Sequence, residues 1–116
     1  LATRPEVETV LHPALDSCPG HAFWKRDFTG ASGLFGVVLK PVGDQALAAM
    51  IDDLQLYGLG DSWGGYESLL VPTNIPANRT VMKWPYTGPS LRIHIGLEDV
   101  DDLIEDLGDG LDRLNA

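Results

Sequence analysis

The sequence predicts an α/β fold: a two-layer sandwich in which helices cover one face of a mainly antiparallel sheet. Three apolar segments have the length of strands, namely residues 34–40, 67–71 and 91–95. Apolar residues with helical spacing follow the first of these segments and also the last. At 116 residues, the chain has the length of a single domain with one modest core.

The first forty residues predict two strands and one short helix. Residues 6–11 alternate loosely and are rich in β-branched side chains, which favours a strand. Prolines and small polar residues predict a loop over 13–20, and the aromatic segment 21–28 is expected to form a short helix. The continuous apolar run 34–40 is typical of a buried strand.

The middle of the chain predicts a helix, a strand and a long loop. Asp44 is expected to cap the helix, and Gly58 is expected to end it. Its apolar residues follow a three-to-four spacing: Leu47, Met50, Ile51 and Leu54. Segment 67–71 predicts a strand that Pro72 ends, because proline lacks the N–H that a strand ladder uses. Further prolines and a glycine predict a loop over 72–89.

The last quarter predicts a strand followed by an amphipathic helix. Apolar and polar side chains alternate over 91–95, so Arg92 and His94 share one face and are expected to point toward a surface or cleft. The closing segment carries one apolar stripe: Leu97, Val100, Leu103, Ile104, Leu107, Leu111 and Leu114. Acidic residues crowd the N-terminal end of this helix and are expected to form a solvated face.

The charge of the chain argues against two classes of partner. The formal net charge is -9, and eight of the 17 acidic residues lie in the last nineteen positions. No run of Lys or Arg opposes this charge, and an acidic surface repels the phosphates of nucleic acids and anionic lipids. We therefore expect neither a nucleic acid nor a membrane as a partner.

Cysteine content and the chain ends predict the cellular setting. The single cysteine, Cys18, cannot form an internal disulfide, and the sequence shows neither a leader peptide nor an apolar segment of membrane-spanning length. These features predict a cytoplasmic protein. The chain starts at Leu1 without an initiator methionine, so we expect it to be part of a longer polypeptide.

The segment Gly60–Gly64 matches the serine-hydrolase pattern G-x-S-x-G. In that interpretation Ser62 is a nucleophile and His94 is its base. The surroundings argue against it, because the pattern requires a strand before the serine and a helix after it, whereas here a helix precedes and a strand follows. A tight turn that offers backbone donors is the favoured interpretation.

Other patterns in the chain favour structural roles. Three glycines with a spacing of three lead into a strand rather than into a helix, which disfavours phosphate binding: Gly30, Gly33 and Gly36. Cys18, His12 and His21 give no recognised metal-ligand spacing and no closed set of four ligands. His94 is expected to be a hydrogen-bonded structural histidine.

Arg92 is the strongest candidate for a binding residue. It lies on a predicted strand, thirty positions after Ser62 in the Gly-rich segment. A guanidinium fixed beside a Gly-rich turn fits the two oxygens of a carboxylate in a geometry that lysine cannot reproduce. The alternative is a surface ion pair with one of the many carboxylates of the chain. Spacing alone does not decide between these two roles.

Four segments together resemble a known family: residues 12–15, 20–30, 62–69 and 91–100. They are similar to the C-terminal domain of the cystathionine β-lyases, which belong to the Cys/Met-metabolism enzymes that use pyridoxal phosphate (PLP). The resemblance covers nearly the whole chain in order. The block Ser-Trp-Gly-Gly-Tyr-Glu-Ser at 62–68 is its most specific part.

The resemblance implies a fold and a reaction. The fold is the small C-terminal domain of fold-type I PLP enzymes, and the full-length family members are homotetramers. The reaction is a β-elimination in methionine biosynthesis that converts cystathionine to homocysteine, pyruvate and ammonia. In the family, the lysine and the aspartate that hold PLP lie in a larger preceding domain. Lys25, Lys40 and Lys83 match none of the family's lysine positions, so the 116-residue chain is expected to be inactive alone.

The resemblance also implies which residues bind the substrate. Arg92 matches the arginine that binds the substrate α-carboxylate, and Ser62 and Trp63 match the turn that completes this pocket. Asp61 departs from the family pattern, in which an aromatic or apolar residue is usual. An alternative function is a free-standing module that uses Arg92 to bind an amino acid or another carboxylate. A serine hydrolase built on Ser62 is the third hypothesis.

Overall fold

The computed structural model describes residues 1–116. Its elements follow in this order: β1 (Val7–Leu11), α1 (His21–Asp27), β2 (Leu34–Leu39), α2 (Asp44–Asp52), β3 (Gly58–Leu59), β4 (Leu69–Thr73), α3 (Ile75–Asn78), β5 (Ser90–His94) and α4 (Val100–Arg113). No helix combines the length and the hydrophobicity that crossing a bilayer requires.

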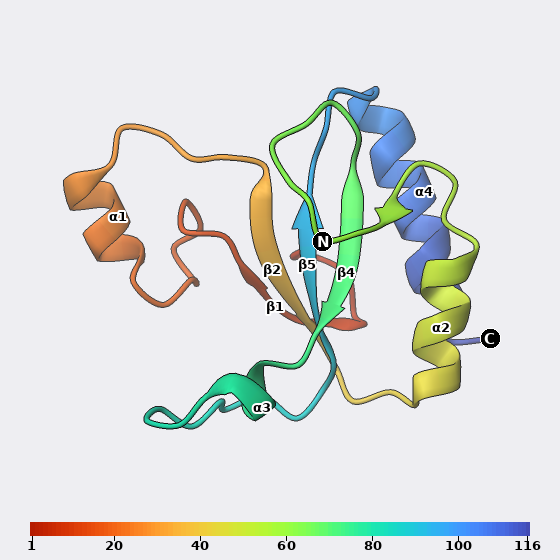
Figure 1. The fold of residues 1–116 in the computed structure, drawn as a ribbon, viewed down its shortest axis with the longest axis horizontal. Coiled ribbons are helices and arrows are strands. Elements are labelled where there is room, and N and C mark those ends of the chain that lie inside the picture. The colour runs from red at the N-terminus through yellow and green to blue at the C-terminus, as the bar shows by residue number, and fades with distance from the viewer.

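The five strands form one sheet in the order β1-β2-β5-β4-β3. Every neighbouring pair is antiparallel except β3 and β4, which run parallel. The mainly antiparallel sheet predicted from the sequence is therefore confirmed, and β5 lies at its centre (Figure 1). Four of the strands and α1 agree with the predicted segments to within two residues at each end.

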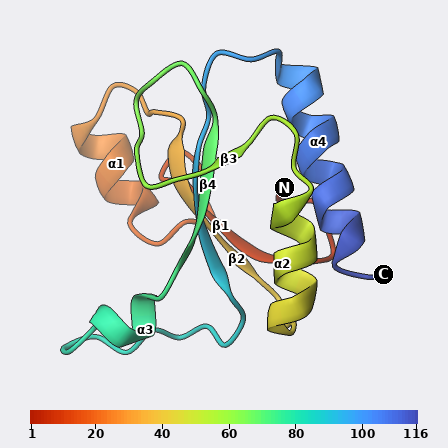
Figure 2. The same cartoon turned by 45° about the vertical axis from the view of Figure 1, so that its right-hand side comes forward.

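Helices α2 and α4 pack side by side on one face of the sheet, as Figure 2 shows. The core lies between these helices and the sheet. Its buried members come from four strands, both helices and the segment after α2: Val7, Val10, Val37, Leu39, Met50, Tyr57, Leu70, Leu91, Ile93, Leu103, Leu107 and Leu111. Such continuous apolar burial is the main contribution to the stability of the domain.

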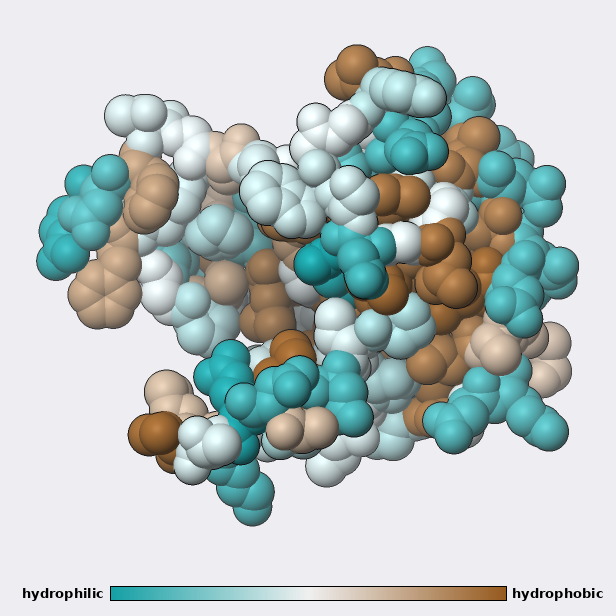
Figure 3. Space-filling view, in the orientation of Figure 1, coloured by the Kyte–Doolittle hydropathy of each residue, from teal (hydrophilic) through white to brown (hydrophobic).

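Two segments stand away from this core. Helix α1 and the segment around α3 protrude from the body, and Figure 3 shows hydrophobic atoms on each of them. Phe23 and Phe28 are 64% exposed, while Val81 near α3 is 93% exposed. The prediction of helices on one face therefore applies to α2 and α4, whereas α1 and α3 lie outside the two layers.

Helix α2 is shorter than predicted and begins differently. It ends at Asp52, Gly58 belongs to β3, and the N-cap residue is Gly43 without any capping bond from a side chain. The early end follows from α4: the Asp106 carboxylate accepts from the backbone N–H groups of Gln55 and Leu56 at distances of 2.8–3.1 Å. These bonds hold the segment after α2 in a non-helical path.

A second residue of α4 bonds to the end of helix α2 itself. Arg113 donates to the carbonyl oxygens of Ala49 at 2.9 Å and Met50 at 2.8 Å. These carbonyls belong to the last turn of α2, where a helix leaves acceptors unpaired. The Arg113 guanidinium of α4 therefore caps the C-terminal end of α2.

Strand β4 was predicted over 67–71 but runs from Leu69 to Thr73, so Pro72 lies inside it. Pro72 is paired with Leu91 of β5, whereas β3 pairs only with Leu69 and Leu70. The far side of β4 at Pro72 therefore has no neighbouring strand that needs an N–H, which is where a sheet tolerates proline. The two-residue strand β3 and the four-residue helix α3 were not predicted.

The acidic segment is only partly the solvated face that the sequence predicted. Asp99 caps α4 by accepting from the backbone N–H groups of Asp101 and Asp102. Four of the eight acidic residues form specific internal bonds: Glu98, Asp99, Asp106 and Asp112. The predicted apolar stripe is also divided, because Leu103 and Leu107 are buried while Ile104 is 66% exposed.

The first and last turns of the chain are joined. Arg4 forms an ion pair with Asp112 of α4, and the Asn115 amide donates to Glu6 at 2.8 Å. Arg4 also pairs with Glu6 at 3.0 Å, so the three contacts form one polar network. This network fastens the N-terminal segment to the end of α4.

Candidate functional site

Strand β5 presents two polar side chains on the face of the sheet that α2 and α4 leave open. Leu91 and Ile93 point into the core, so Arg92 between them and His94 beyond them point to the opposite face. In the sheet, Arg92 is paired with Gly36 of β2 and with Val71 of β4. Gly36 has no side chain, and the Leu11 side chain of β1 lies next to it.

The Gly-rich loop (residues 60–67) covers this face of β5. Figure 2 shows the connection between β3 and β4 arching on the side of the sheet away from α4. The Arg92 guanidinium donates to the main-chain carbonyl of Asp61. The structure therefore brings Arg92 to the loop one residue before Ser62.

Arg92 is free of carboxylate partners. None of the ion pairs of the chain includes Arg92, although 17 acidic residues are present. A guanidinium has five N–H donors, and the bond to Asp61 uses one of them. The alternative of a surface ion pair therefore does not describe Arg92 in this structure, and its remaining donors are available to a ligand.

The Gly-rich loop has further unpaired donors. The backbone N–H groups of Ser62, Trp63 and Gly65 form no hydrogen bond within the chain. Gly64 has φ +85°, a left-handed conformation that favours glycine and turns the loop sharply. Trp63 is 62% exposed and Tyr66 is 76% exposed. The arrangement combines a cation, unpaired amides and open aromatic surface, a set that suits a small anion attached to an organic group.

His94 fastens the loop to β5. Its Nδ1 accepts from the Gly64 N–H at 3.3 Å, and its Nε2 donates to the Gly65 carbonyl at 3.1 Å. His94 is thus the hydrogen-bonded structural histidine that the sequence predicted. Neither nitrogen contacts Ser62, so the pairing of nucleophile and base that a serine hydrolase needs is absent from this geometry.

A second fastening lies in the turn after β5. The Glu98 carboxylate accepts from the Ser68 N–H at 2.7 Å and from the Ser68 hydroxyl at 2.6 Å, and that hydroxyl accepts from the Gly96 N–H at 2.8 Å. The Ser68 hydroxyl bond, with support from the Ser68 N–H, holds the pKa of Glu98 below its usual value despite partial burial. The end of the loop is therefore tied to the start of α4.

Sequence reasoning missed the structural roles of Ser68, Gly96 and Glu98. Gly96 is needed because a Cβ there would lie 2.2 Å from the Tyr66 carbonyl oxygen. The available signal was weak: a glycine directly after a strand, followed by a glutamate, indicates close approach but does not identify the approaching segment. Only the fold places residue 68 beside residue 98.

The candidate metal-ligating residues lie elsewhere and already have partners. His12 bonds to the Ser32 carbonyl at 3.1 Å. His21 bonds to the Pro13 carbonyl at 2.7 Å and faces Asp16 at 3.0 Å. Cys18 lies in the same connection between β1 and α1 and is partly buried. These contacts hold that connection together.

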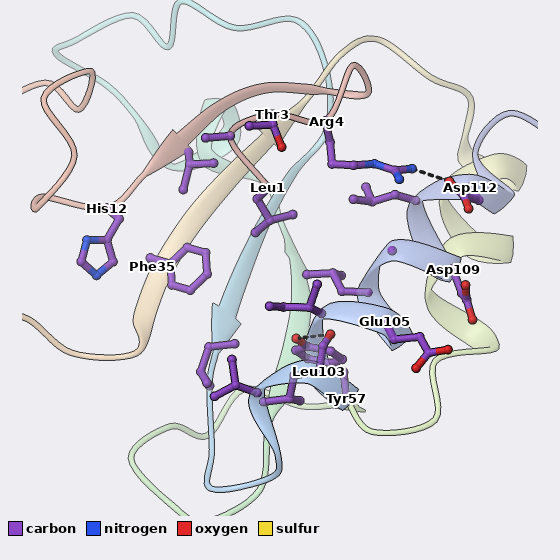
Figure 4. A pocket seen from close by; sticks show the side chains of 18 of the residues that line it. Leu1, Thr3, Arg4, His12, Phe35, Tyr57, Leu103, Glu105, Asp109 and Asp112 are labelled. Atoms are coloured by element: carbon purple, nitrogen blue, oxygen red, sulfur yellow. Dashed lines mark hydrogen bonds and ion pairs between the residues drawn. The ribbon is translucent and has the colours of Figure 1, made fainter.

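A large groove lies on the opposite face of the sheet. This α4 groove, between the N-terminal segment, the sheet and α4, has a volume of about 750 Å³. Figure 4 shows Leu1 and Phe35 directed into it, with α4 along its other side and acidic residues on its rim. Val100 and Ile104 on α4 line it and are both 66% exposed. Arg92 does not line the groove, so the two features are separate surfaces.

Comparison with known proteins connects this geometry to a family. The family model described as Cys/Met metabolism PLP-dependent enzyme matches residues 1–112. The cystathionine beta-lyase of Salmonella typhimurium is 51% identical over 118 aligned residues, which cover 98% of this chain and 30% of that protein. The cystathionine beta-lyase of Escherichia coli is 50% identical over the same shares. An L-alanine/L-glutamate racemase of Wolbachia pipientis is 41% identical over 98% of this chain.

A solved structure agrees with these sequence matches. The cystathionine gamma synthase of Xanthomonas oryzae, in complex with cystathionine, matches with a TM-score of 0.80 and 32% identity. The match covers 99% of this chain and 31% of that protein. The chain thus spans about 30% of the length of the relatives that it matches.

Proposed function

Because the chain belongs to the Cys/Met-metabolism family of PLP-dependent enzymes, we propose that it is the C-terminal domain of a carbon-sulfur β-lyase. Its part in the reaction is to bind the α-carboxylate of cystathionine or a related thioether amino acid. The remaining part of the polypeptide supplies the PLP site, and the products are homocysteine, pyruvate and ammonia. Residues 1–116 alone are inactive in this proposal.

The observation that carries the proposal is the environment of Arg92. The guanidinium lies against the Gly-rich loop and has no carboxylate of its own chain as a partner. Arg92 is half-buried, so its guanidinium is partly removed from water. A partly dehydrated cation without an anionic partner is energetically unfavourable. A bound carboxylate would satisfy the guanidinium with two parallel bonds.

The loop completes the carboxylate pocket in this proposal. Trp63 contributes its unpaired N–H group, and the exposed Ser62 contributes its hydroxyl. Because His94 and Glu98 fasten the loop at two places, these donors are oriented before the substrate binds. Holding the carboxylate at a fixed angle orients the α-carbon toward the reacting groups, which lowers the entropic part of the barrier.

In this proposal the PLP-binding lysine is not one of the lysines of this chain. Lys25 lies on α1, Lys40 follows β2 and Lys83 lies between α3 and β5, and all three are exposed. None of them bonds to Arg92 or to the Gly-rich loop. When bound to the whole enzyme, PLP supplies the electron sink of the reaction. The proposal places its lysine in the rest of the polypeptide.

The α4 groove supports a place within a larger protein. An apolar groove of this size on a folded domain marks an interaction surface. Glu105, Asp109 and Asp112 line its α4 side, so a segment that fills it would combine apolar residues with basic residues on one edge. In the proposal, the PLP-binding part of the same polypeptide occupies this groove.

The test uses the full-length protein that carries this chain. Arg92→Ala is expected to raise the KM for cystathionine at least tenfold while the absorbance of bound PLP stays unchanged. The matched control is Arg79→Ala, because Arg79 is an exposed arginine that lies over Trp84 near α3. An unchanged KM in Arg92→Ala would remove Arg92 from the site and defeat the proposal.

One observation favours a second function. Arg92 and the Gly-rich loop both belong to this chain and are in contact, so both proposed carboxylate-binding parts lie within it. The chain could therefore bind an amino acid as a free-standing module. Calorimetric titration of the 116-residue chain with cystathionine and other amino acids separates the two: micromolar binding supports the module, and no binding supports a half-site.

A further inference from the structure

His94 is buried beneath the Gly-rich loop and makes two different kinds of hydrogen bond with it. It is 8% exposed and lies two residues after Arg92 on the same face of β5. The Gly64 N–H can only donate, so Nδ1 must accept; the Gly65 carbonyl can only accept, so Nε2 must carry a proton. Both bonds exist together only in the neutral imidazole protonated on Nε2.

The two bonds to His94 pair one backbone donor of the loop and leave the donors before it unpaired. His94 engages the Gly64 N–H and the Gly65 carbonyl, which belong to two neighbouring residues at the left-handed turn. The N–H groups of Ser62 and Trp63 are left without partners. An apolar side chain at position 94 would leave the Gly64 N–H unpaired as well and would release the turn from β5.

We propose that His94 is a positioning residue whose neutral Nε2–H form holds the turn at Gly64 and Gly65, so that the Trp63 N–H and the Ser62 hydroxyl keep their places in the loop that Arg92 contacts. This inference rests on the proposed function, since it assigns His94 a role in binding the same substrate carboxylate. His94 itself does not touch the substrate. It acts through the main chain of the loop.

The proposal has a pH dependence with a definite sign. A protonated His94 carries hydrogens on both nitrogens, so Nδ1 no longer accepts from Gly64 and the turn is released. Two charged groups lie near His94: Glu98 in the turn after β5 interacts with it electrostatically, and Arg92 lies two residues earlier on the same face of β5. Its sheet partners on the neighbouring strands are the uncharged Leu34 and Leu69. Protonation of His94 at acid pH therefore lowers the substrate affinity.

The test measures the full-length enzyme with three variants beside the wild type. His94→Phe keeps the volume and removes both bonds, so the KM for cystathionine rises about tenfold while kcat and the PLP absorbance stay close to wild type. His94→Asn keeps an acceptor near the Nδ1 position and recovers part of this loss. Ser90→Ala is the matched control, because Ser90 lies on the same face of β5 and bonds to Thr73, at the far end of the strand from the loop.

The pH profile separates positioning from a loss of packing. The wild-type KM rises at acid pH, whereas His94→Phe and His94→Asn, which cannot titrate, show no such rise. If His94→Phe does not fold, as a lost PLP absorbance would reveal, His94→Asn decides: the same acid rise as in wild type overturns the inference.

Arg92→Ala, measured in parallel, distinguishes the two proposals. A raised KM in Arg92→Ala together with wild-type values in both His94 variants overturns the role of His94 alone. Wild-type values in Arg92→Ala defeat the proposed function itself.

Discussion

Gly96 lies so close to Tyr66 that a Cβ atom at position 96 would be 2.2 Å from the Tyr66 carbonyl oxygen. The Leu97 N–H donates to that same oxygen at 2.8 Å. The turn after β5 therefore holds the Gly-rich loop by main-chain contact, at a place where no side chain fits. Any side chain at position 96 must move the loop.

We expect Gly96→Ala to displace the loop and to lower the free energy of unfolding by about 1–3 kcal/mol, because an inserted methyl group overpacks a tight contact. In the full-length enzyme the KM should rise as well, since the loop carries the proposed carboxylate donors. Denaturant unfolding and steady-state kinetics measure the two effects. Gly30→Ala is the control, because a Cβ at position 30 meets no atom within 4 Å.

Two glycines of α4 provide a paired prediction of opposite sign. A Cβ at Gly108 meets nothing within 4 Å, so Gly108→Ala should stabilise the helix by about 0.5–1 kcal/mol. A Cβ at Gly110 would lie 2.9 Å from the Leu54 side chain and 3.3 Å from the Met50 carbonyl, so Gly110→Ala should destabilise the chain. Equal effects in urea unfolding would show that α2 and α4 do not pack as described.

The Glu98 carboxylate predicts a pH dependence of stability. Its folded pKa is lowered from 4.5 by the bonds from Ser68, so its contribution is fully present above that value and is lost as the pH falls below it. Glu98→Gln should therefore be less stable than wild type near pH 7, and the difference should shrink at acid pH. Urea unfolding over this range measures it, with the exposed Glu105→Gln as the control.

Asp61 places a carboxylate next to the proposed anion pocket. Its carbonyl oxygen binds Arg92, and its side chain is exposed without an ion-pair partner. Removing the solvent-exposed Asp61 charge, which repels the substrate carboxylate, should improve substrate binding by up to about 1 kcal/mol. Asp61→Asn should therefore lower the KM for cystathionine by about two- to fivefold. High salt should reduce the difference, and a raised KM would instead give Asp61 a role in holding the substrate.

The α4 groove predicts the behaviour of the 116-residue chain in solution. Because Ile104 and Val100 are exposed in an apolar groove, the chain should bind a hydrophobic dye and associate with itself. Ile104→Lys should reduce both, as sedimentation and dye fluorescence would measure. Val81→Lys is the matched control, since Val81 is 93% exposed but lies outside the groove. Equal effects of the two substitutions would argue against the groove as the interaction surface.

The sequence predicted the parts of this fold that depend on local periodicity. Strand β5, with Arg92 and His94 on one face, follows from the alternation of apolar and polar residues, and Arg92 contacts the Gly-rich loop as expected. The assignment of Arg92, Ser62 and Trp63 as substrate-binding residues remains a prediction. These positions could be proposed from the sequence because the residue types and their spacing in the chain match the family motif.

The parts that were wrong depend on contacts between distant segments. Helix α2 ends early because the Asp106 carboxylate, fifty positions later in the chain, accepts from the backbone that follows the helix. No local sequence pattern predicts this contact. Pro72 was expected to end a strand. Because β3 is too short to pair with β4 at Pro72, no hydrogen bond is lost through the missing N–H of this proline. Asp99 and Glu98 were read as part of a solvated face, because the sequence does not show which backbone groups lie within their reach.

The polar network between Arg4, Glu6, Asp112 and Asn115 brings the first and last turns of the domain together. A short linker could therefore join these turns, and new termini could be opened in the exposed segment between α3 and β5. A circular permutant of this kind should retain the sheet order while releasing the N-terminal segment from any upstream tether. Such a rearranged domain would allow the face that carries Arg92 to be studied with the attachment point moved to the segment between α3 and β5.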